Sequence, residues 1–278
     1  MPTALIVEDE PDANTLLSML VQMRGYRPQS ALGGIEALDQ LHRHRPDVVL
    51  LDLMLPDLSG YEVCRVIKSA RETTLIPVVV VSAARVEENE ARCYAAGAND
   101  FVPKPYTPDQ IFRALAAADA WRKDVGRRPA EGCFSFDLRD PLEPLRELSR
   151  LRSLLRAWTP LPDDSLCAVI AALRDLWDSA SSWGRQHDDA GPGHGRPIAS
   201  VHYRLESDRL VCSIEDRGEG WLLHDAPATP PSLDGLPADL VETERHDDRL
   251  VLVCRHAPVD PEPDADPDSD LHDTDDVH

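Results

Sequence analysis

Five polar side chains near the start of the chain could together carry out phosphoryl-transfer chemistry. Each follows a short apolar run, and they are Glu8, Asp9, Asp52, Ser82 and Lys104. Three carboxylates held close together repel one another, and they stay ionised only when a cation neutralises them. A hard divalent ion such as Mg²⁺ prefers such oxygen ligands. Asp52 could then attack a phosphorus atom, while the Ser82 hydroxyl and the Lys104 ammonium group bind the phosphoryl oxygens.

The segments around these residues predict a sheet that would bring them together. The strand-like runs are TALIVE, RPQSA, DVVLLDLM, PVVVVSA and DFVPK, and helix-like segments lie at about 11–24, 34–44, 60–71, 85–96 and 107–121. This alternation is typical of an α/β doubly wound fold, here with a five-stranded parallel sheet of the flavodoxin-like type. Functional sites in such folds lie outside the carboxyl ends of the strands. Carboxylates there can also be helix caps or solvated loop residues, but five matching positions favour one shared site.

The order and spacing of these motifs resemble the response-regulator receiver domain of two-component systems. The resemblance covers residues 1–123 through the motifs VEDE, LLDLMLPDLSG, VVSA and VPKP. It implies that Asp52 accepts phosphate from a sensor histidine kinase or a phosphotransfer protein. It also implies that Glu8, Asp9, Asp52 and the main-chain carbonyl of Met54 bind Mg²⁺. A receiver that keeps these residues without ever being phosphorylated would carry the same motifs.

Two further features follow from the same resemblance. The bond between Lys104 and Pro105 should be cis, which is energetically accessible only before proline. Phe101, three residues before the lysine, matches the aromatic position that changes conformation when such domains are phosphorylated. Together these features predict a phosphorelay switch that acts through a packing change, and not an enzyme with its own turnover.

Composition and charge set limits on partners and location. The chain of 278 residues has a net charge of −21, and residues 130–278 alone hold 14 Lys/Arg against 32 Asp/Glu, a balance of −18. A duplex-binding face must neutralise phosphates, so this charge predicts no nucleic-acid partner. The alternative of a local patch of arginines stays open. No apolar run is long enough to span a membrane, and no signal peptide is visible. A cytoplasmic protein with six packed thiols is expected.

The second half predicts a different architecture. A charged linker is expected at 124–132, an α+β sandwich domain at 133–258, and a disordered acidic tail at 259–278. Leucines at helical spacing predict helices over 141–157 and 163–183. The run IASVHYRLESDRLVCSIED predicts two antiparallel strands, and DRLVLVCRH a final strand.

This second domain resembles the histidine-kinase-like ATPase fold in its anti-sigma-factor serine kinase branch. The resemblance rests on CSIEDRGEGW, on ALRDLWDSASSWG and on LPADLVETERHDDRLVLVCR, which is expected to hold the last helix and strand. It implies a degenerate nucleotide site made by Asp175, Ser179, Asp216, Gly218 and Gly220. Ser179 stands where the family has a metal-binding asparagine, and the lid is replaced by a proline-bearing segment. ATP binding is therefore not expected.

The domain is predicted to be a protein-binding output module, whose partner could belong to a sigma/anti-sigma pathway. The alternative is a receiver-gated serine kinase.

Overall fold

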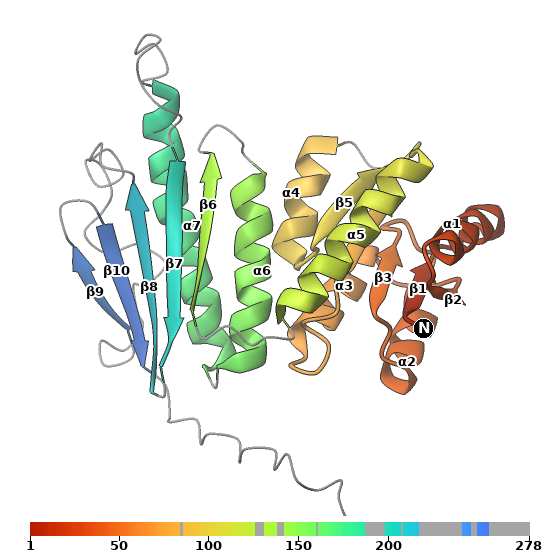
Figure 1. Cartoon of the computed structure of the whole chain (residues 1–278), viewed down its shortest axis with the longest axis horizontal. Helices are drawn as coiled ribbons and strands as arrows, with labels where there is room; N and C mark the ends of the chain where they lie inside the picture. Colours follow the sequence, from red (N-terminus) through yellow and green to blue (C-terminus); the bar gives the residue numbers. More distant parts are fainter. Residues whose placement is uncertain are drawn as a thin grey trace, which may run out of the picture.

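The computed structural model contains two sheets with helices packed on and between them (Figure 1). It describes residues 1–83, 86–125, 131–137, 142–159, 161–186, 198–206, 208–216, 241–245 and 249–255. The predicted acidic tail therefore lies outside the described residues. None of the described helices combines the length and the apolar character needed to cross a membrane.

The first sheet is parallel and five-stranded, as predicted, with the order β2-β1-β3-β4-β5. Its strands are β1 Thr3–Val7, β2 Arg27–Ala31, β3 Val48–Leu51, β4 Val78–Ser82 and β5 Asp100–Pro103. The helices are α1 Pro11–Met23, α2 Gly34–Arg43, α3 Gly60–Ser69, α4 Val86–Ala96 and α5 Pro108–Val125. Helix α5 continues beyond the predicted domain end at 123.

Strand β3 shows why this sheet needs helices on both faces. All four of its side chains are buried. Val48 and Leu50 pack into the core on the side of α1 and α5, whereas Val49 and Leu51 pack into the core on the side of α2, α3 and α4. The alternation of side chains along a strand thus places every second residue in a different core. A run of apolar residues without polar alternation is what such a strand requires.

The second sheet is antiparallel, with the order β6-β7-β8-β10-β9. Its strands are β6 Glu131–Asp137, β7 Ile198–Leu205, β8 Arg209–Asp216, β9 Val241–Arg245 and β10 Arg249–Arg255. Helices α6 Glu143–Trp158 and α7 Asp163–Gln186 share one apolar core with the sheet. Strand β6 begins inside the predicted linker 124–132, and residues 126–130 of that linker are not described.

One predicted element of the second half is wrong. Residues 241–245 were expected to lie in the last helical segment, but they form strand β9 and pair antiparallel with β10. The sequence VETER alternates β-branched residues with glutamates, and this period of two suits a strand with one exposed face. Glu242 and Glu244 are both exposed.

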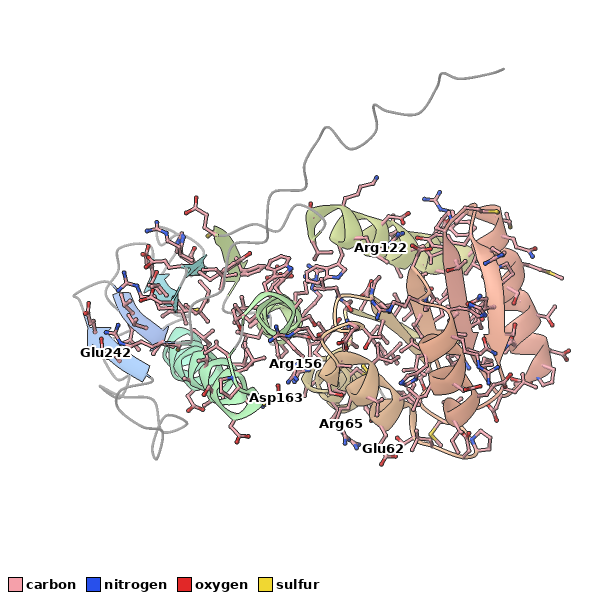
Figure 2. The ribbon with its side chains drawn as sticks, turned by 90° about the horizontal axis from the view of Figure 1, so that it is seen from below. Glu62, Arg65, Arg122, Arg156, Asp163 and Glu242 are labelled. Atoms are coloured by element: carbon pink, nitrogen blue, oxygen red, sulfur yellow. The ribbon has the colours of Figure 1, made fainter. Side chains whose placement is uncertain are left out.

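Helix α6 joins the two halves of the molecule, because it lies between the first domain and helix α7 (Figures 1 and 2). On its receiver side the Ser149 hydroxyl donates to the carbonyl of Ala98 at 3.0 Å. The Arg152 guanidinium donates to the carbonyl of Ala95 at 3.1 Å. Arg156 joins both halves, because its guanidinium donates to the carbonyl of Ser69 at 2.9 Å and forms a 2.6 Å ion pair with Asp163 at the start of α7.

The second core also receives a side chain from the first domain. Trp121, near the end of α5, is 7% exposed and belongs to the cluster formed by α6, α7 and the antiparallel sheet. Its indole N–H donates to the carbonyl of Leu75 at 2.9 Å, in the connection between α3 and β4. Trp121 therefore contacts both halves of the molecule.

Candidate functional site

Four of the five predicted receiver residues directly follow or end a strand, and Asp9 is the next residue after Glu8. The amide of Glu8 donates to the carbonyl of Ala31 at 3.1 Å, and the amide of Asp52 donates to that of Val7 at 2.9 Å. These bonds extend the parallel ladder by one residue beyond β1 and β3. The amide of Lys104 likewise donates to the carbonyl of Ser82 at 2.9 Å. The side chains are thus held at one edge of a rigid sheet.

The structure brings the five predicted side chains together around Asp52. Its Oδ1 accepts a hydrogen bond from the Ser82 hydroxyl at 3.0 Å, and its Oδ2 lies 2.5 Å from the Lys104 Nζ. The same Nζ lies 2.6 Å from the Glu8 Oε2. Glu8 is 2% exposed and Asp52 7%. Asp9 is exposed, and its carboxylate lies beside these two.

Burial and the lysine act in opposite directions on the two buried carboxylates. Burial raises the pKa of Glu8, and Lys104 only partly offsets this. Burial would also raise the pKa of Asp52, but the hydrogen bonds from Lys104, the Met54 amide and Ser82 outweigh it, so this pKa lies below its ordinary value. The two carboxylates raise the pKa of Lys104 against the effect of its own burial. The Asp52 carboxylate is therefore ionised at neutral pH.

The acidic cluster has the chemistry of a magnesium site. The carboxylate oxygens of Glu8, Asp9 and Asp52 lie within 4.8 Å of one another, and oxygen-only ligand sets suit hard divalent cations. Among the described residues, no other group of three or more such side chains lies within this distance. Receiver domains bind Mg²⁺ in an acidic pocket of this kind, so the residues present fit the ion.

The two features predicted from the resemblance occupy their expected places. The peptide bond between Lys104 and Pro105 is cis. Phe101 lies in β5 with 8% of its surface exposed, and it packs in the core on the side of α2, α3 and α4. Its movement on phosphorylation stays a prediction.

Asn14 is a contributor that the sequence analysis missed. Its side-chain amide donates to the Glu8 carbonyl at 3.1 Å and accepts from the Ser30 hydroxyl at 2.7 Å. It is buried on α1 in line with Leu17 and Val21. A polar residue on the apolar face of a predicted helix is the signal that could have revealed it, because buried amides need hydrogen-bond partners.

We expect Asn14→Ala to lower the free energy of unfolding by about 1–3 kcal/mol, because it leaves the Glu8 carbonyl and the Ser30 hydroxyl without this partner. Mg²⁺ affinity should fall as well, since the Glu8 segment loses its anchor. Urea unfolding and metal titration would measure the two effects. Thr15→Ala is a matched control on the exposed face of the same helix, and an equal loss there would contradict this role.

Gly60 allows the backbone to pack closely behind Asp52. A Cβ atom at this position would overlap the main-chain oxygen of Asp52 and lie 2.6 Å from the Cα of Leu53. The Gly60 amide donates to the Leu53 carbonyl at 3.0 Å. In the same loop, Asp57 accepts hydrogen bonds from the amides of Gly34 and Ile35 at the start of α2. Both contacts fix the loop that follows the acceptor.

The predicted nucleotide residues of the second half are only partly described. Asp175 lies on α7 and is half-buried. Ser179 lies on the same helix and Asp216 ends β8, but the placement of their side chains lies outside the described residues. Gly218 and Gly220 are outside them altogether. The degenerate nucleotide site therefore stays a prediction.

The fold and this crevice define a receiver domain of two-component signalling. The family described as "Response regulator receiver domain" matches residues 4–116. The chain is 34% identical over 231 residues to "Response regulator MprA" of Mycobacterium sp. (strain KMS), which covers 80% of this chain and 97% of that relative. The chain therefore belongs to the response-regulator family.

Other relatives match the first domain alone. The chain is 32% identical over 117 residues to the "DNA-binding dual master transcriptional regulator RpaA" of Synechocystis sp. PCC 6803, covering 42% of this chain and 48% of that protein. A solved structure of a putative response regulator from Chloroflexus aurantiacus is 29% identical, covers 43% of this chain and 99% of that chain, and has a TM-score of 0.41. The chain spans about half the length of the first curated relatives it matches.

These relatives contradict the prediction of no nucleic-acid partner, because RpaA is named a DNA-binding regulator. The prediction used the summed charge of half the chain, whereas duplex binding depends on a local surface. The same matches give no support to an ATPase-like second domain. The structure shows an antiparallel sheet in this half, and the matches do not define its fold type.

Proposed function

We propose that this response regulator is switched by phosphorylation of Asp52, with a sensor histidine kinase or a phosphotransfer protein as the donor. The observation that carries the proposal is the position of the Lys104 Nζ between the carboxylates of Asp52 and Glu8, at 2.5 Å and 2.6 Å. A carboxylate kept ionised beside a fixed cation can attack phosphorus, and the cation can then hold the incoming phosphoryl oxygens.

In this proposal the side chains divide the steps of phosphoryl transfer among them. The Asp52 carboxylate attacks the phosphorus atom in line with the departing donor group. The Lys104 ammonium and the Ser82 hydroxyl donate to phosphoryl oxygens. Glu8, Asp9, Asp52 and the main-chain carbonyl of Met54 would hold Mg²⁺, which when bound neutralises the charge on those oxygens.

The test is phosphorylation by acetyl phosphate with Mg²⁺, followed by intact-mass measurement. The expected result is one added phosphoryl group on the native chain and none on Asp52→Asn. Glu62→Gln is the matched control, because Glu62 is an exposed carboxylate on the neighbouring helix α3, and this variant should keep the label. A labelled Asp52→Asn variant, or an unlabelled native chain, would refute the assignment.

We further propose that the signal passes through α6 to the second domain. Phosphate adds about −1.5 to −2 charge beside Lys104 and Ser82, and movement of Ser82 toward it would leave space for Phe101 to turn inward. Strand β5 and α4 would shift with Phe101. The hydrogen bonds from Ser149 and Arg152 to Ala98 and Ala95 would then change.

Hydrogen exchange with and without beryllofluoride, a phosphoryl mimic, tests this route. Amides of α6 should exchange several-fold faster in the presence of the mimic, because the helix loses fixed partners on α4. Strand β2, on the opposite edge of the first sheet, is the internal control and should not change. Equal exchange of α6 in both states would rule the route out.

For the output, we propose a partner-binding module that acts in the cytoplasm. The six free thiols support that location. The DNA-binding name of one relative makes a duplex the second candidate partner, and a serine kinase remains the alternative. Three experiments on the full chain separate a protein partner, a duplex and a kinase. They are pull-down with and without beryllofluoride, a DNA mobility shift and calorimetry with Mg-ATP. Tight Mg-ATP binding with transfer of phosphate to a serine would favour the kinase.

A further inference from the structure

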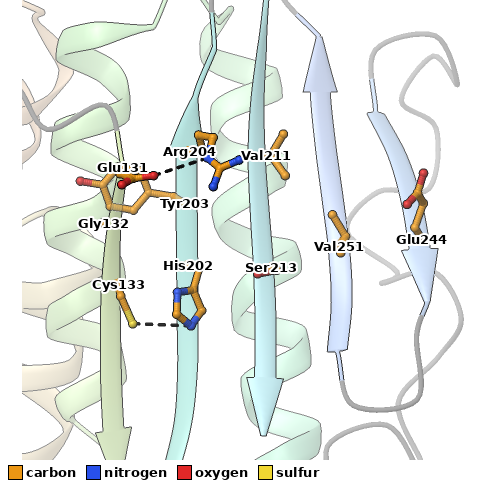
Figure 3. A pocket seen from close by; sticks show the side chains of 10 residues that line it. All are labelled: Glu131, Gly132, Cys133, His202, Tyr203, Arg204, Val211, Ser213, Glu244 and Val251. Atoms are coloured by element: carbon orange, nitrogen blue, oxygen red, sulfur yellow. Dashed lines mark hydrogen bonds and ion pairs between the residues drawn. The ribbon is translucent and has the colours of Figure 1, made fainter.

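The antiparallel sheet carries an exposed cysteine beside an exposed histidine, at a place that the receiver chemistry does not use. Cys133 on β6 and His202 on β7 are directly opposite each other in the strand register. Side chains at such positions are neighbours, because their Cβ atoms lie about 5 Å apart. The Cys133 Sγ lies 3.6 Å from the His202 Nε2 (Figure 3). The pairing of the two strands therefore holds the thiol beside the imidazole.

The imidazole can act as the base that takes the thiol proton. In the tautomer that carries its hydrogen on Nδ1, the Nε2 of His202 has a lone pair that can accept this proton. The Oε2 of Glu215, on the next strand β8, lies 3.7 Å from the same Nε2. Its negative charge favours the imidazolium that forms when the proton arrives. A thiol in contact with a base is the arrangement of an activated cysteine nucleophile.

Accessibility separates Cys133 from most of the other thiols. The prediction of six packed thiols is wrong for two of them, because Cys133 and Cys167 are exposed. Burial raises the pKa of each of the remaining thiols, so they stay protonated and out of contact with reagents. These buried thiols are Cys64, Cys93, Cys212 and Cys254. Of the two exposed thiols, only Cys133 contacts a histidine among the described residues.

A hollow beside this pair leaves room for a reagent. Its volume is about 600 Å³, and Cys133 and His202 both line it (Figure 3). Hollows of this size are typical of small-molecule sites. The charged groups of the described lining are Arg204, Glu131 and Glu244, so the lining is acidic on balance. Small molecules that carry ammonium groups therefore suit the hollow better than anions do.

We propose that Cys133 is a modification site that exchanges with low-molecular-weight disulfides, with His202 as the base. In this step the S–H bond of Cys133 breaks, and its proton passes to the His202 Nε2. A new S–S bond forms between Cys133 and one sulfur of the disulfide, whose own S–S bond breaks. The other sulfur leaves as a thiolate and takes the proton from His202. The protein thiol is oxidised and the disulfide is reduced, so no further oxidant is needed.

The modification is independent of the phosphoryl chemistry at Asp52, because it uses residues of the second sheet alone. A free thiol reverses the exchange, so the amount of adduct follows the ratio of disulfide to thiol around the protein. In a reducing compartment such disulfides are transient and serve in redox sensing. Cys133 thus gives the second domain a redox input that is separate from the receiver.

Cystamine, a small disulfide with two ammonium groups, is the probe. The reduced full chain is treated with it at pH 7, and the adducts are counted by intact mass and located by peptide mapping. Cys133 should react at least about tenfold faster than Cys167, since a positioned base accelerates proton transfer by about a hundredfold or more in enzymes. Dithiothreitol should remove the adduct. Equal rates at the two exposed cysteines would overturn the proposal.

His202→Asn tests the role of the base. At pH 7 the rate at Cys133 should fall about tenfold in this variant, whereas Cys167 in the same chain should react as before. Above about pH 9 thiols ionise without help, so the native and variant rates at Cys133 should converge. An unchanged rate at pH 7, or an equal loss at both pH values, would show that His202 is not the base. If His202→Asn unfolds, which extra adducts at the buried thiols would reveal, His202→Gln takes its place in the same comparison.

Discussion

Replacement of Lys104 by Met is expected to lower the free energy of unfolding by about 3 kcal/mol at neutral pH without Mg²⁺. Removal of one partner from a buried ion pair costs about 3–5 kcal/mol. We expect the lower end because the crevice opens to solvent at Asp9. The variant keeps most of the apolar stem of the side chain but leaves Glu8 and Asp52 as two buried carboxylates with no cation. Chemical denaturation in a chelating buffer measures the effect.

Two conditions should restore the stability of Lys104→Met. Mg²⁺ binds the folded state and stabilises it by mass action, so the variant should gain more from the ion than the native chain does. Lower pH should act in the same direction. Without the lysine, burial should raise the pKa of both carboxylates in the folded variant. The folded variant then binds protons more tightly than the unfolded chain does. Its loss of free energy of unfolding should therefore become smaller as the pH falls toward 5.

The native chain should show the opposite trend at Asp52. Its folded pKa is lowered, so the stability that it contributes is present above the unfolded pKa and is lost as the pH falls through the folded one. Lys123→Met is the control, because Lys123 is exposed near the end of α5 and its loss should change little. A Lys104→Met deficit that is independent of both pH and Mg²⁺ would show that the ion pair is not its cause.

Trp121→Ala is expected to lower the free energy of unfolding by about 3–5 kcal/mol, the usual range for removal of a buried tryptophan side chain. Trp121 lies in the receiver's last helix but packs in the core of the second domain. Its loss should therefore also uncouple the two halves. Calorimetry should show one unfolding transition for the native chain and two for the variant.

A conservative variant separates packing from hydrogen bonding at this position. Trp121→Phe keeps most of the apolar volume but removes the donor to the Leu75 carbonyl. We expect a loss of about 1 kcal/mol and a single transition. If Trp121→Ala unfolds in one transition at the native temperature, the shared core does not couple the halves.

The parallel domain was predictable because each of its signals is local. Four strands are uninterrupted apolar runs or nearly so, and the site residues stand directly after them or at their ends. Strand β2, with the sequence RPQSA, is the least apolar of the five, and its prediction depended on the alternation of the elements around it. The crevice followed from topology, since parallel strands end at one edge of their sheet.

The contacts between the two halves, strand β9 and the register of the second sheet were not predictable, because they depend on residues far apart in the sequence or on very short patterns. The hydrogen bonds from Ser149 and Arg152 to the end of α4 and the turn after it join residues more than fifty positions apart, and no pattern in one sequence encodes such a pairing. Strand β9 is only five residues long. Its alternation of residue types is too short to outweigh the resemblance to the ATPase fold, which predicted a helix at this position. The pairing of β6 with β7, which sets Cys133 opposite His202, depends on a strand register that is set by the whole sheet.

The ends of the two sheets bear on how the protein behaves when it is concentrated. Strands β2 and β9 are each the last strand on one side of their sheet, and a bare edge invites pairing with a strand from another molecule. Strand β2 carries Pro28, which lacks an amide donor, and β9 carries the exposed glutamates 242 and 244. Both devices disfavour fibril-like stacking. An engineer who fuses a reporter to this regulator or shortens it should leave those two strands unchanged, because solubility depends on residues that take part in neither signalling nor metal binding.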